Sequence, residues 1–119
     1  MSLVGAKVPA QDSSSVYNRL FLEAVVERQK GNDTAAFDLL QRCVQINPNA
    51  AESHYYLAHY YLKLKKNKEA LACFEKAARL EPSNTTYTET LAEMYVSLAD
   101  YKNAIALWEK IFETDGSRE

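Results

Sequence analysis

The chain has 119 residues, of which 47% are hydrophobic and 25% are charged, and its formal net charge is −2. This composition predicts a single folded domain and excludes a wholly disordered chain. The nearly balanced charge gives no electrostatic basis for binding nucleic acid. No apolar run approaches the roughly 18 residues of a membrane span, so direct membrane insertion is not expected. Three glycines and three prolines are too few for the many turns of a sandwich or barrel.

Residues 1–15 are predicted to be a disordered tail, because Gly5, Pro9 and three consecutive serines interrupt a segment that has no hydrophobic period. Ser14 or Ser15 is the expected N-cap of the first helix. Residues 1–16 also lack the apolar core of a signal peptide. At the other end, residues 117–119 are expected to form a short tail.

An internal repeat of 34 residues organises the rest of the chain. Pro48 and Pro82 are 34 residues apart, and counting back from them defines blocks 17–50, 51–84 and 85–116. Stacked on one another, the blocks align residues of similar size at four positions. The eighth position has Ala24, Ala58 and Ala92, and the twentieth has Ala36, Ala70 and Ala104. The twenty-fourth position has the bulky residues Leu40, Phe74 and Trp108. The twenty-seventh position has Cys43, Ala77 and Ile111. Small residues allow two helices to approach closely, and proline ends the second helix of a block.

This pattern resembles the tetratricopeptide repeat family, in three consecutive copies. The middle copy fits best, with Leu57-Ala58, Tyr61, Ala70, Phe74, Ala77 and Pro82 at the signature positions. The departures are Glu23 and Glu27 in the first copy, and Gly116 in place of the third proline. The resemblance implies an all-α fold over residues 16–116, an α-α superhelix (a right-handed solenoid) of three antiparallel helix pairs. The implied helices span 15–29, 33–46, 50–64, 67–80, 84–98 and 101–114, with Asn49 and Asn84 as expected caps and Tyr61 in the core.

The first and last helices are predicted to differ on their outer faces. Arg19, Glu23, Glu27 and Lys30 form a polar stripe on the first helix, which predicts that the array starts there. The last helix carries an apolar stripe that nothing later in the sequence can cover: Ile105, Trp108, Ile111 and Phe112. Three explanations stay open for that stripe, namely further repeats in a longer parent chain, association with a second copy, or a tolerated exposed patch.

The family resemblance further implies a concave groove lined by the first helix of each pair. At the groove positions this chain has Phe21, Val25 and Arg28, then Tyr55, His59, Leu62 and Lys63, then Glu89 and Glu93. Tyr55 and His59 are expected to face the groove, where aromatic rings offer contact area at low entropic cost. The alternative is that Tyr55 only packs against Phe21. A family subset holds carboxylates with Lys and Asn in the first repeat, and Phe21 and Val25 replace those residues here, so that clamp is absent.

No catalytic constellation is present in the sequence, and no cofactor is expected. His54 and His59 point to different faces of one helix, so they do not predict a shared metal site, and His54 is expected to be packed or half-buried. Cys43 and Cys73 are interpreted as inert thiols. The lysine run Lys63, Lys65, Lys66 and Lys68 is interpreted as a solvated turn at a helix C-terminus.

The sequence therefore predicts a non-catalytic scaffold that binds a peptide or a partner protein in its groove. The competing hypothesis is a structural segment of a longer solenoid that has no ligand of its own. The visible sequence suggests a cytoplasmic setting. Long multi-repeat bacterial proteins often begin in this way after an export or lipid-anchor signal, so a periplasmic or envelope setting is the open alternative.

Overall fold

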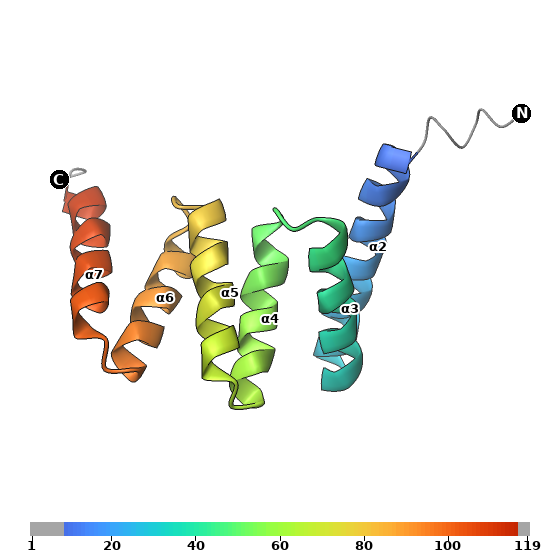
Figure 1. Ribbon diagram of the computed structural model, residues 1–119. Coiled ribbons are helices and arrows are strands. Elements are labelled where there is room, and N and C mark those ends of the chain that lie inside the picture. Colours follow the sequence, from blue (N-terminus) through green and yellow to red (C-terminus); the bar gives the residue numbers. More distant parts are fainter. Residues whose placement is uncertain (1–8, 117–119) are drawn as a thin grey trace, which may run out of the picture.

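The computed structural model describes the backbone of residues 9–116 and the side chains of residues 13–114. Within this range the chain forms six helices and no strands. The helices lie side by side in chain order and form an elongated all-α solenoid (Figure 1). They are α2 (Pro9–Gln29), α3 (Asp33–Ile46), α4 (Ala51–Lys63), α5 (Asn67–Leu80), α6 (Thr85–Ser97) and α7 (Tyr101–Gly116).

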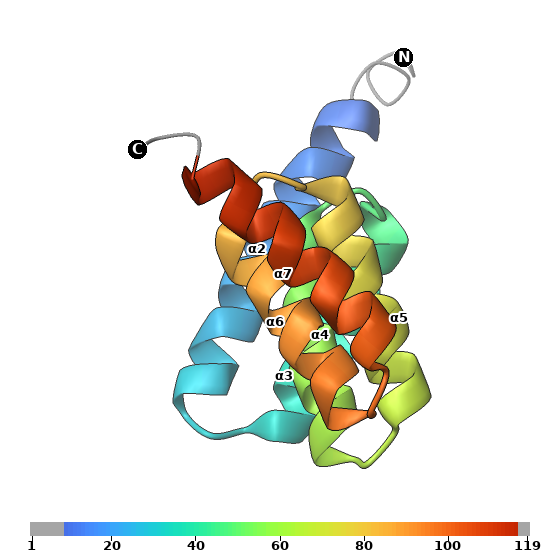
Figure 2. The same ribbon diagram turned by 90° about the vertical axis from the view of Figure 1, so that its left-hand side faces the viewer.

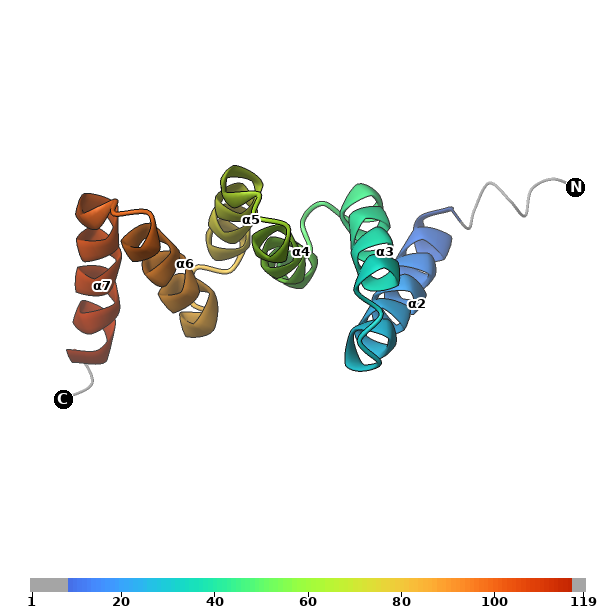
Figure 3. The same cartoon turned by 90° about the horizontal axis from the view of Figure 1, so that it is seen from below.

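The helices associate as three antiparallel pairs, α2 with α3, α4 with α5, and α6 with α7. The pairs are separate layers when the molecule is seen from below (Figure 3). In the end-on view of Figure 2, α7 lies in front of α6 and covers the end of the stack. The predicted all-α architecture of three helix pairs is therefore confirmed.

The predicted helix bounds agree with the structure within a residue or two, except at the start of α2. That helix begins at Pro9, so the prediction of a disordered tail through residue 15 is wrong for residues 9–15, and neither Ser14 nor Ser15 is an N-cap. Proline is well suited to the first turn of a helix because its missing N–H has no partner to lose there. The three serines that follow are weak helix formers but do not break a helix. Residues 1–8 and 117–119, where the predicted tails continue, lie outside the described residues.

The turn inside each pair has the same backbone geometry. Gly31, Lys65 and Ala99, spaced 34 residues apart, have φ angles of 83°, 60° and 61°. In each case the next residue donates its backbone N–H five residues back: Asn32 to Glu27 at 2.9 Å, Lys66 to Tyr61 at 2.9 Å, and Asp100 to Tyr95 at 2.8 Å. This is the Schellman motif that ends a helix through a left-handed residue.

The core confirms the alignment of the repeats. The alanines of the eighth and twentieth positions are all buried, and so are Leu40 and Phe74 of the twenty-fourth position. Their counterpart Trp108 is only half-buried. Small side chains bring the helices of a pair together, and the bulky residue fills the space toward the next pair.

Tyr61 packs against the core, as expected, but it is not the more deeply buried of two neighbouring tyrosines. The Tyr60 side chain is buried, whereas Tyr61 is half-buried. Phe37 of α3 meets both rings, with centroid distances of 6.4 Å to Tyr60 and 5.4 Å to Tyr61. The two tyrosines therefore share the junction, because neighbouring residues on α4 differ in direction by about 100° and α3 reaches both.

Of the two predicted caps, only one forms. The Asn84 side chain accepts a hydrogen bond from the backbone N–H of Tyr87 at 3.2 Å, which confirms it as the N-cap of α6. The N-cap of α4 is Ala50, which provides no side-chain bond, so the prediction for Asn49 is wrong. The backbone N–H of Asn49 instead donates to the side chain of Asn47 at 3.1 Å, which places Asn49 in the preceding turn.

Candidate functional site

An open cavity of about 850 Å³ lies along the first helices of the three pairs, at the predicted groove. Most of its lining comes from α4, with contributions from the end of α2, the start of α3 and the start of α6. The lining residues are Arg28, Gln29, Asp33, Tyr55, Tyr56, His59, Tyr60, Lys63 and Thr86. A groove lined mainly by aromatic and charged side chains is suited to holding a peptide segment.

Tyr55 is the centre of an aromatic cluster that joins the second and third repeats. Its ring centroid lies 4.8 Å from that of His59 and 4.7 Å from that of Tyr87. The ring of Phe74 on α5 contacts both of these rings, with centroid distances of 5.9 Å to Tyr55 and 5.1 Å to His59. The Tyr55 hydroxyl lies 3.4 Å from the hydroxyl of Thr90. These contacts hold the two rings in place while each stays half-buried.

On the α2 side, Tyr56 rather than Tyr55 meets the first repeat. The rings of Tyr56 and Phe21 are 6.1 Å apart, and the guanidinium of Arg28 lies 4.5 Å from the Tyr56 ring centroid. The alternative that Tyr55 packs on Phe21 is therefore wrong. Tyr55 turns toward α6 instead, because the two adjacent side chains leave the helix in different directions.

Charges surround the aromatic floor of the groove. Lys63 pairs with Asp33 at 3.2 Å, and its ammonium also lies 5.3 Å from the Tyr60 ring centroid. Arg28 is exposed, and its guanidinium lies over the Tyr56 ring. Burial lowers the pKa of His59, and the positive charges of Arg28 and Lys63 lower it further. His59 therefore presents a neutral imidazole at neutral pH, which can donate or accept one hydrogen bond.

The structure brings four of the predicted groove residues together around this cavity, namely Arg28, Tyr55, His59 and Lys63. The other predicted residues do not line it. Phe21 and Leu62 pack partly into the core, Val25 is half-buried, Glu89 is half-buried and Glu93 is exposed farther along α6.

The sequence reasoning missed the tyrosines at the sixth and tenth repeat positions, Tyr56 and Tyr60, and also Asp33. Their only signal was the density of tyrosines on α4. Asp33 begins the second helix of its pair, so the set of first-helix positions could not include it.

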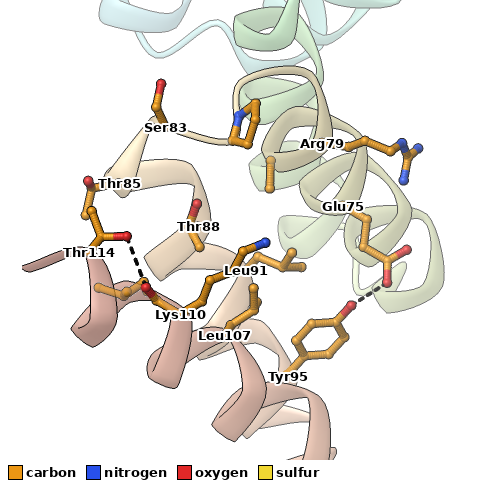
Figure 4. A pocket seen from close by; sticks show the side chains of 13 residues that line it. Glu75, Arg79, Ser83, Thr85, Thr88, Leu91, Tyr95, Leu107, Lys110 and Thr114 are labelled. Carbon is orange, nitrogen blue, oxygen red and sulfur yellow. Dashed lines mark hydrogen bonds between the residues drawn. The ribbon is translucent and has the colours of Figure 1, made fainter. Parts of the chain in front are cut away.

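A second cavity, of about 840 Å³, is lined by residues of α5, α6 and α7 (Figure 4). Leu91 and Leu107 are among its apolar lining residues, and the Lys110 side chain extends across it toward Leu91. The Tyr95 hydroxyl donates to Glu75 at 2.6 Å across one side. Burial and this carboxylate raise the pKa of Tyr95. Sequence reasoning did not identify this cavity.

Side-chain size explains why the second cavity is open. At the fourth repeat position α6 has Thr88, where α4 has His54. The His54 ring is half-buried, as predicted, and its Nε2 atom lies 2.8 Å from the carbonyl oxygen of Pro48. At the twenty-eighth position Ala78 replaces Val44. Two smaller side chains therefore leave the space unfilled.

The outer face of α7 is apolar, although not with the predicted membership. Ile105 is 57% exposed and Phe112 is 64% exposed, and the half-buried Trp108 lies 6.0 Å from the Phe112 ring. Ile111, which was predicted to belong to this surface, is buried. It occupies the twenty-seventh repeat position, which faces the interior of its own helix pair.

The outer face of α2 is less polar than predicted. Arg19 and Glu23 form an ion pair at 3.6 Å, and Lys30 and Glu27 form one at 3.3 Å. Between these pairs Leu22 and Val26 are 64% and 49% exposed and line a shallow depression. The predicted stripe of four charged residues is present, but an apolar pair interrupts it.

The thiols and histidines show no activating arrangement in the described part of the chain. Burial raises the pKa of Cys43, and it raises the pKa of Cys73 to about 11, so both favour the neutral thiol. Among the described residues, no group of three or more His, Cys, Asp or Glu side chains is placed to hold a metal ion. Lys65, Lys66 and Lys68 are exposed around the α4–α5 turn, as predicted. No helix within residues 9–116 is long and apolar enough to cross a membrane.

Comparison with solved structures places this fold among helical repeat proteins. The crystal structure of MamA superposes with a TM-score of 0.74 at 19% identity, covering 86% of this chain and 60% of that chain. The TPR domain of P58(IPK) gives a TM-score of 0.79 at 18% identity, covering 98% of this chain and 33% of that chain. An O-GlcNAc transferase from Thermobaculum terrenum gives a TM-score of 0.72 at 19% identity, covering 85% of this chain and 19% of that chain.

These likenesses concern the fold, and the chain spans less than two thirds of the MamA length. A search of curated protein sequences finds no match. A family model described as anaphase-promoting complex, cyclosome, subunit 3 matches residues 3–77, which is more than half of the chain and covers the first repeat and most of the second. Together with the 34-residue period and the buried alanines, this match shows that the chain belongs to that family, which is of the tetratricopeptide repeat type.

Proposed function

We propose that this chain is a non-catalytic interaction module that holds a peptide or a segment of a partner protein in the groove along α2, α4 and α6. The observation that carries the proposal is the half-buried aromatic pair Tyr55 and His59, which lines an open cavity instead of being closed into the core. Rigid aromatic rings supported from below are typical anchors of interaction surfaces, because little conformational entropy is lost when they bind.

The chemistry of the groove suggests the kind of ligand. An apolar or aromatic side chain would pack against Tyr55, Tyr56 and His59. A carboxylate on the ligand could pair with the exposed Arg28, whose guanidinium is already oriented by the Tyr56 ring. Basic groups farther along the ligand could reach Glu93 on α6. The neutral His59 adds one hydrogen bond to the apolar anchor without adding charge.

The test is selection from a random peptide library by the wild-type chain and by the double variant Tyr55→Ala, His59→Ala. We expect the wild type to enrich peptides that the double variant loses. Tyr101→Ala is the matched control, because Tyr101 is 58% exposed and begins α7, away from the groove. Since Tyr55 and His59 both contact Phe74, circular dichroism must show that the double variant is folded.

A second variant makes the test independent of core packing. Arg28→Glu changes an exposed residue at the edge of the groove and should weaken binding of any selected peptide that carries a carboxylate. If a well-folded wild type enriches no peptide, the groove proposal fails, and the rings serve to pack the second repeat against the third in a purely structural segment.

A further inference from the structure

The cavity lined by α5, α6 and α7 is separate from the proposed groove. The two cavities share no lining residue: α6 contributes Thr86 to the groove, and it contributes Thr88, Leu91 and Tyr95 to the second cavity. The second cavity lies between the second and third repeats, both of which the structure describes, and not at an end of the array. Its volume of about 840 Å³ lies within the range of roughly 300–1,000 Å³ that is usual for pockets that bind small molecules.

Apolar side chains from all three helices form much of the cavity lining. They are Ala78 of α5, Leu91 of α6, and Leu107 and Ile111 of α7. Leu91 and Ile111 are buried in the core and still border the cavity, so its inner wall is continuous with the core of the third repeat. The apolar part of a ligand would be removed from water on this wall, which favours binding.

The hydroxyl groups on the inner side of the cavity already have hydrogen-bond partners. The Thr88 hydroxyl donates to the carbonyl oxygen of Asn84 at 3.2 Å. The Tyr95 hydroxyl donates to the carboxylate of Glu75 at 2.6 Å, so the charged group of Glu75 is also engaged. Because these groups are satisfied within the protein, the inner part of the cavity does not require a polar ligand.

Lys110 brings a positive charge to this apolar wall. Its side chain extends from α7 across the cavity toward Leu91 (Figure 4). Within residues 13–114 the basic side chains that form ion pairs are Arg19, Lys30 and Lys63, so Lys110 has no carboxylate partner there. An ammonium group beside an apolar surface and without a carboxylate partner favours a ligand with an anionic group.

From this arrangement we propose that the cavity binds a small amphipathic carboxylate, whose apolar body lies against Ala78, Leu91 and Leu107 and whose carboxylate pairs with Lys110. Such a ligand covers apolar surface and supplies the missing partner of the ammonium group. The proposal does not depend on peptide binding in the groove, because the two sites have no residue in common.

The test uses decanoate as the probe and follows the amide chemical shifts of the wild-type chain by two-dimensional NMR, up to about 1 mM probe. We expect saturable shifts at the lining residues of α5, α6 and α7, and none around Tyr55 and His59 in the groove. Decyltrimethylammonium has the same alkyl chain and the opposite charge. It should bind at least about tenfold more weakly, because it cannot pair with Lys110.

Reversing the charge of Lys110 tests the contact with the carboxylate. Lys110→Glu changes an exposed side chain, so the fold should be unaffected, and decanoate should bind at least about tenfold more weakly. Lys102→Glu is the matched control, because Lys102 is also exposed on α7 and does not line the cavity. It should bind decanoate as the wild type does.

Filling the cavity tests the apolar part of the site without changing any charge. Ala78→Phe places an aromatic ring in the cavity from α5, and Thr88→Phe places one there from α6. Each variant should lose decanoate binding. Circular dichroism checks that the variants are folded, and having one variant on each helix keeps the test valid if the other variant does not fold.

Three results would overturn the proposal. If the wild type shows no saturable shifts up to about 1 mM decanoate, the cavity is not a site for such a ligand. If Lys110→Glu or a folded cavity-filling variant binds decanoate as tightly as the wild type does, the probe binds elsewhere. Equal binding of decanoate and decyltrimethylammonium would show that the site does not select a carboxylate.

Discussion

The alanine at the eighth position of each repeat determines how closely the two helices of a pair approach. Ala24, Ala58 and Ala92 are at most 1% exposed. Ala58 lies in a cluster with Ala70 on the paired helix and with Phe74. Only a methyl group fits between these backbones, and interiors packed to this density respond to single methylene groups.

Replacing Ala58 with leucine should therefore lower the free energy of unfolding by about 1–3 kcal/mol, because the larger side chain forces the helices apart. Ala72→Leu is the control, since Ala72 is exposed on α5 and both residues are good helix formers. Urea denaturation of the two variants measures the difference. Equal stability of the two variants would contradict the repeat alignment.

Tyrosine hydroxyls form a second set of residue-scale contacts, and most of them link repeats. The Tyr17 hydroxyl donates to Glu52 at 2.7 Å and lies 2.8 Å from the buried hydroxyl of Ser53. Burial raises the pKa of Tyr87 to about 12, and nearby carboxylates, first Glu81 and then Glu52, add to the effect. The folded state therefore favours the protonated form of these tyrosine side chains.

The free energy of unfolding should consequently fall as the pH rises from about 10 toward 12. The unfolded chain loses a tyrosine proton near pH 10, whereas folded Tyr87 keeps it to about pH 12, so stability is complete below pH 10 and is lost above it. Tyr87→Phe removes one such group and should make the fall shallower. Urea titrations at a series of pH values measure this, with Tyr101→Phe as the exposed control. An unchanged slope in Tyr87→Phe would show that this hydroxyl does not contribute.

At the scale of the element, the ends of the first helices have the same backbone geometry in all three repeats. The three turns within pairs use a left-handed residue at the same repeat position, although only the first is a glycine. A Cβ atom added at Gly31 would meet nothing within 4 Å, so a substitution there acts through the backbone alone. For a residue other than glycine, the left-handed conformation costs about 1–2 kcal/mol.

Ala99→Gly should therefore raise the free energy of unfolding by about 0.5–1 kcal/mol, the relief of strain exceeding the greater entropy of glycine in the unfolded chain. Gly31→Ala should lower it by a comparable amount. Thermal and urea denaturation of both variants test the pair together. Changes of the same sign in the two variants would contradict the assigned backbone geometry.

The helix caps provide a second comparison at this scale. Asn84→Ala removes the hydrogen bond to the Tyr87 backbone N–H and should cost about 1 kcal/mol. Asn49→Ala changes the same residue type one position before the α4 cap and should be nearly neutral. Urea midpoints of the two variants decide the matter. A larger loss in Asn49→Ala would mean that Asn49, and not Ala50, caps α4.

At the scale of the whole molecule, the described residues form a linear array in which each pair packs only on its neighbours. The free energy of unfolding of such an array is approximately the sum of the contributions of the individual repeats and of the junctions between them. The α6–α7 pair has a junction on one side only, and beside it lies the cavity left by Thr88 and Ala78. We therefore expect the third repeat to unfold before the middle one.

Trp108 provides the measurement, because it is the single tryptophan of the chain and lies on α7. Its fluorescence should report a lower urea midpoint than far-ultraviolet circular dichroism, which follows all the helices. Coincident transitions would show that the three repeats unfold as one cooperative unit.

The sequence by itself determined the period, the helix pairs and most of the helix bounds. It could do so because contacts in a solenoid link segments that are near in sequence, and because alanine size and proline positions act locally. The family resemblance added the prediction that Tyr55, His59, Arg28 and Lys63 lie on one side of the array, since these residues occupy the positions at which that family lines its groove.

Only the tertiary structure decided how adjacent aromatic side chains divide between surfaces. Tyr55 turns to α6 and Tyr56 to α2, and Tyr60 is buried more deeply than Tyr61. Successive side chains on a helix differ in direction by about 100°, so the sequence gives the approximate direction of each side chain. The sizes of the side chains on the facing helix then decide whether that side chain is buried or exposed. For the same reason Ile111 is buried while Phe112, its neighbour in sequence, is exposed.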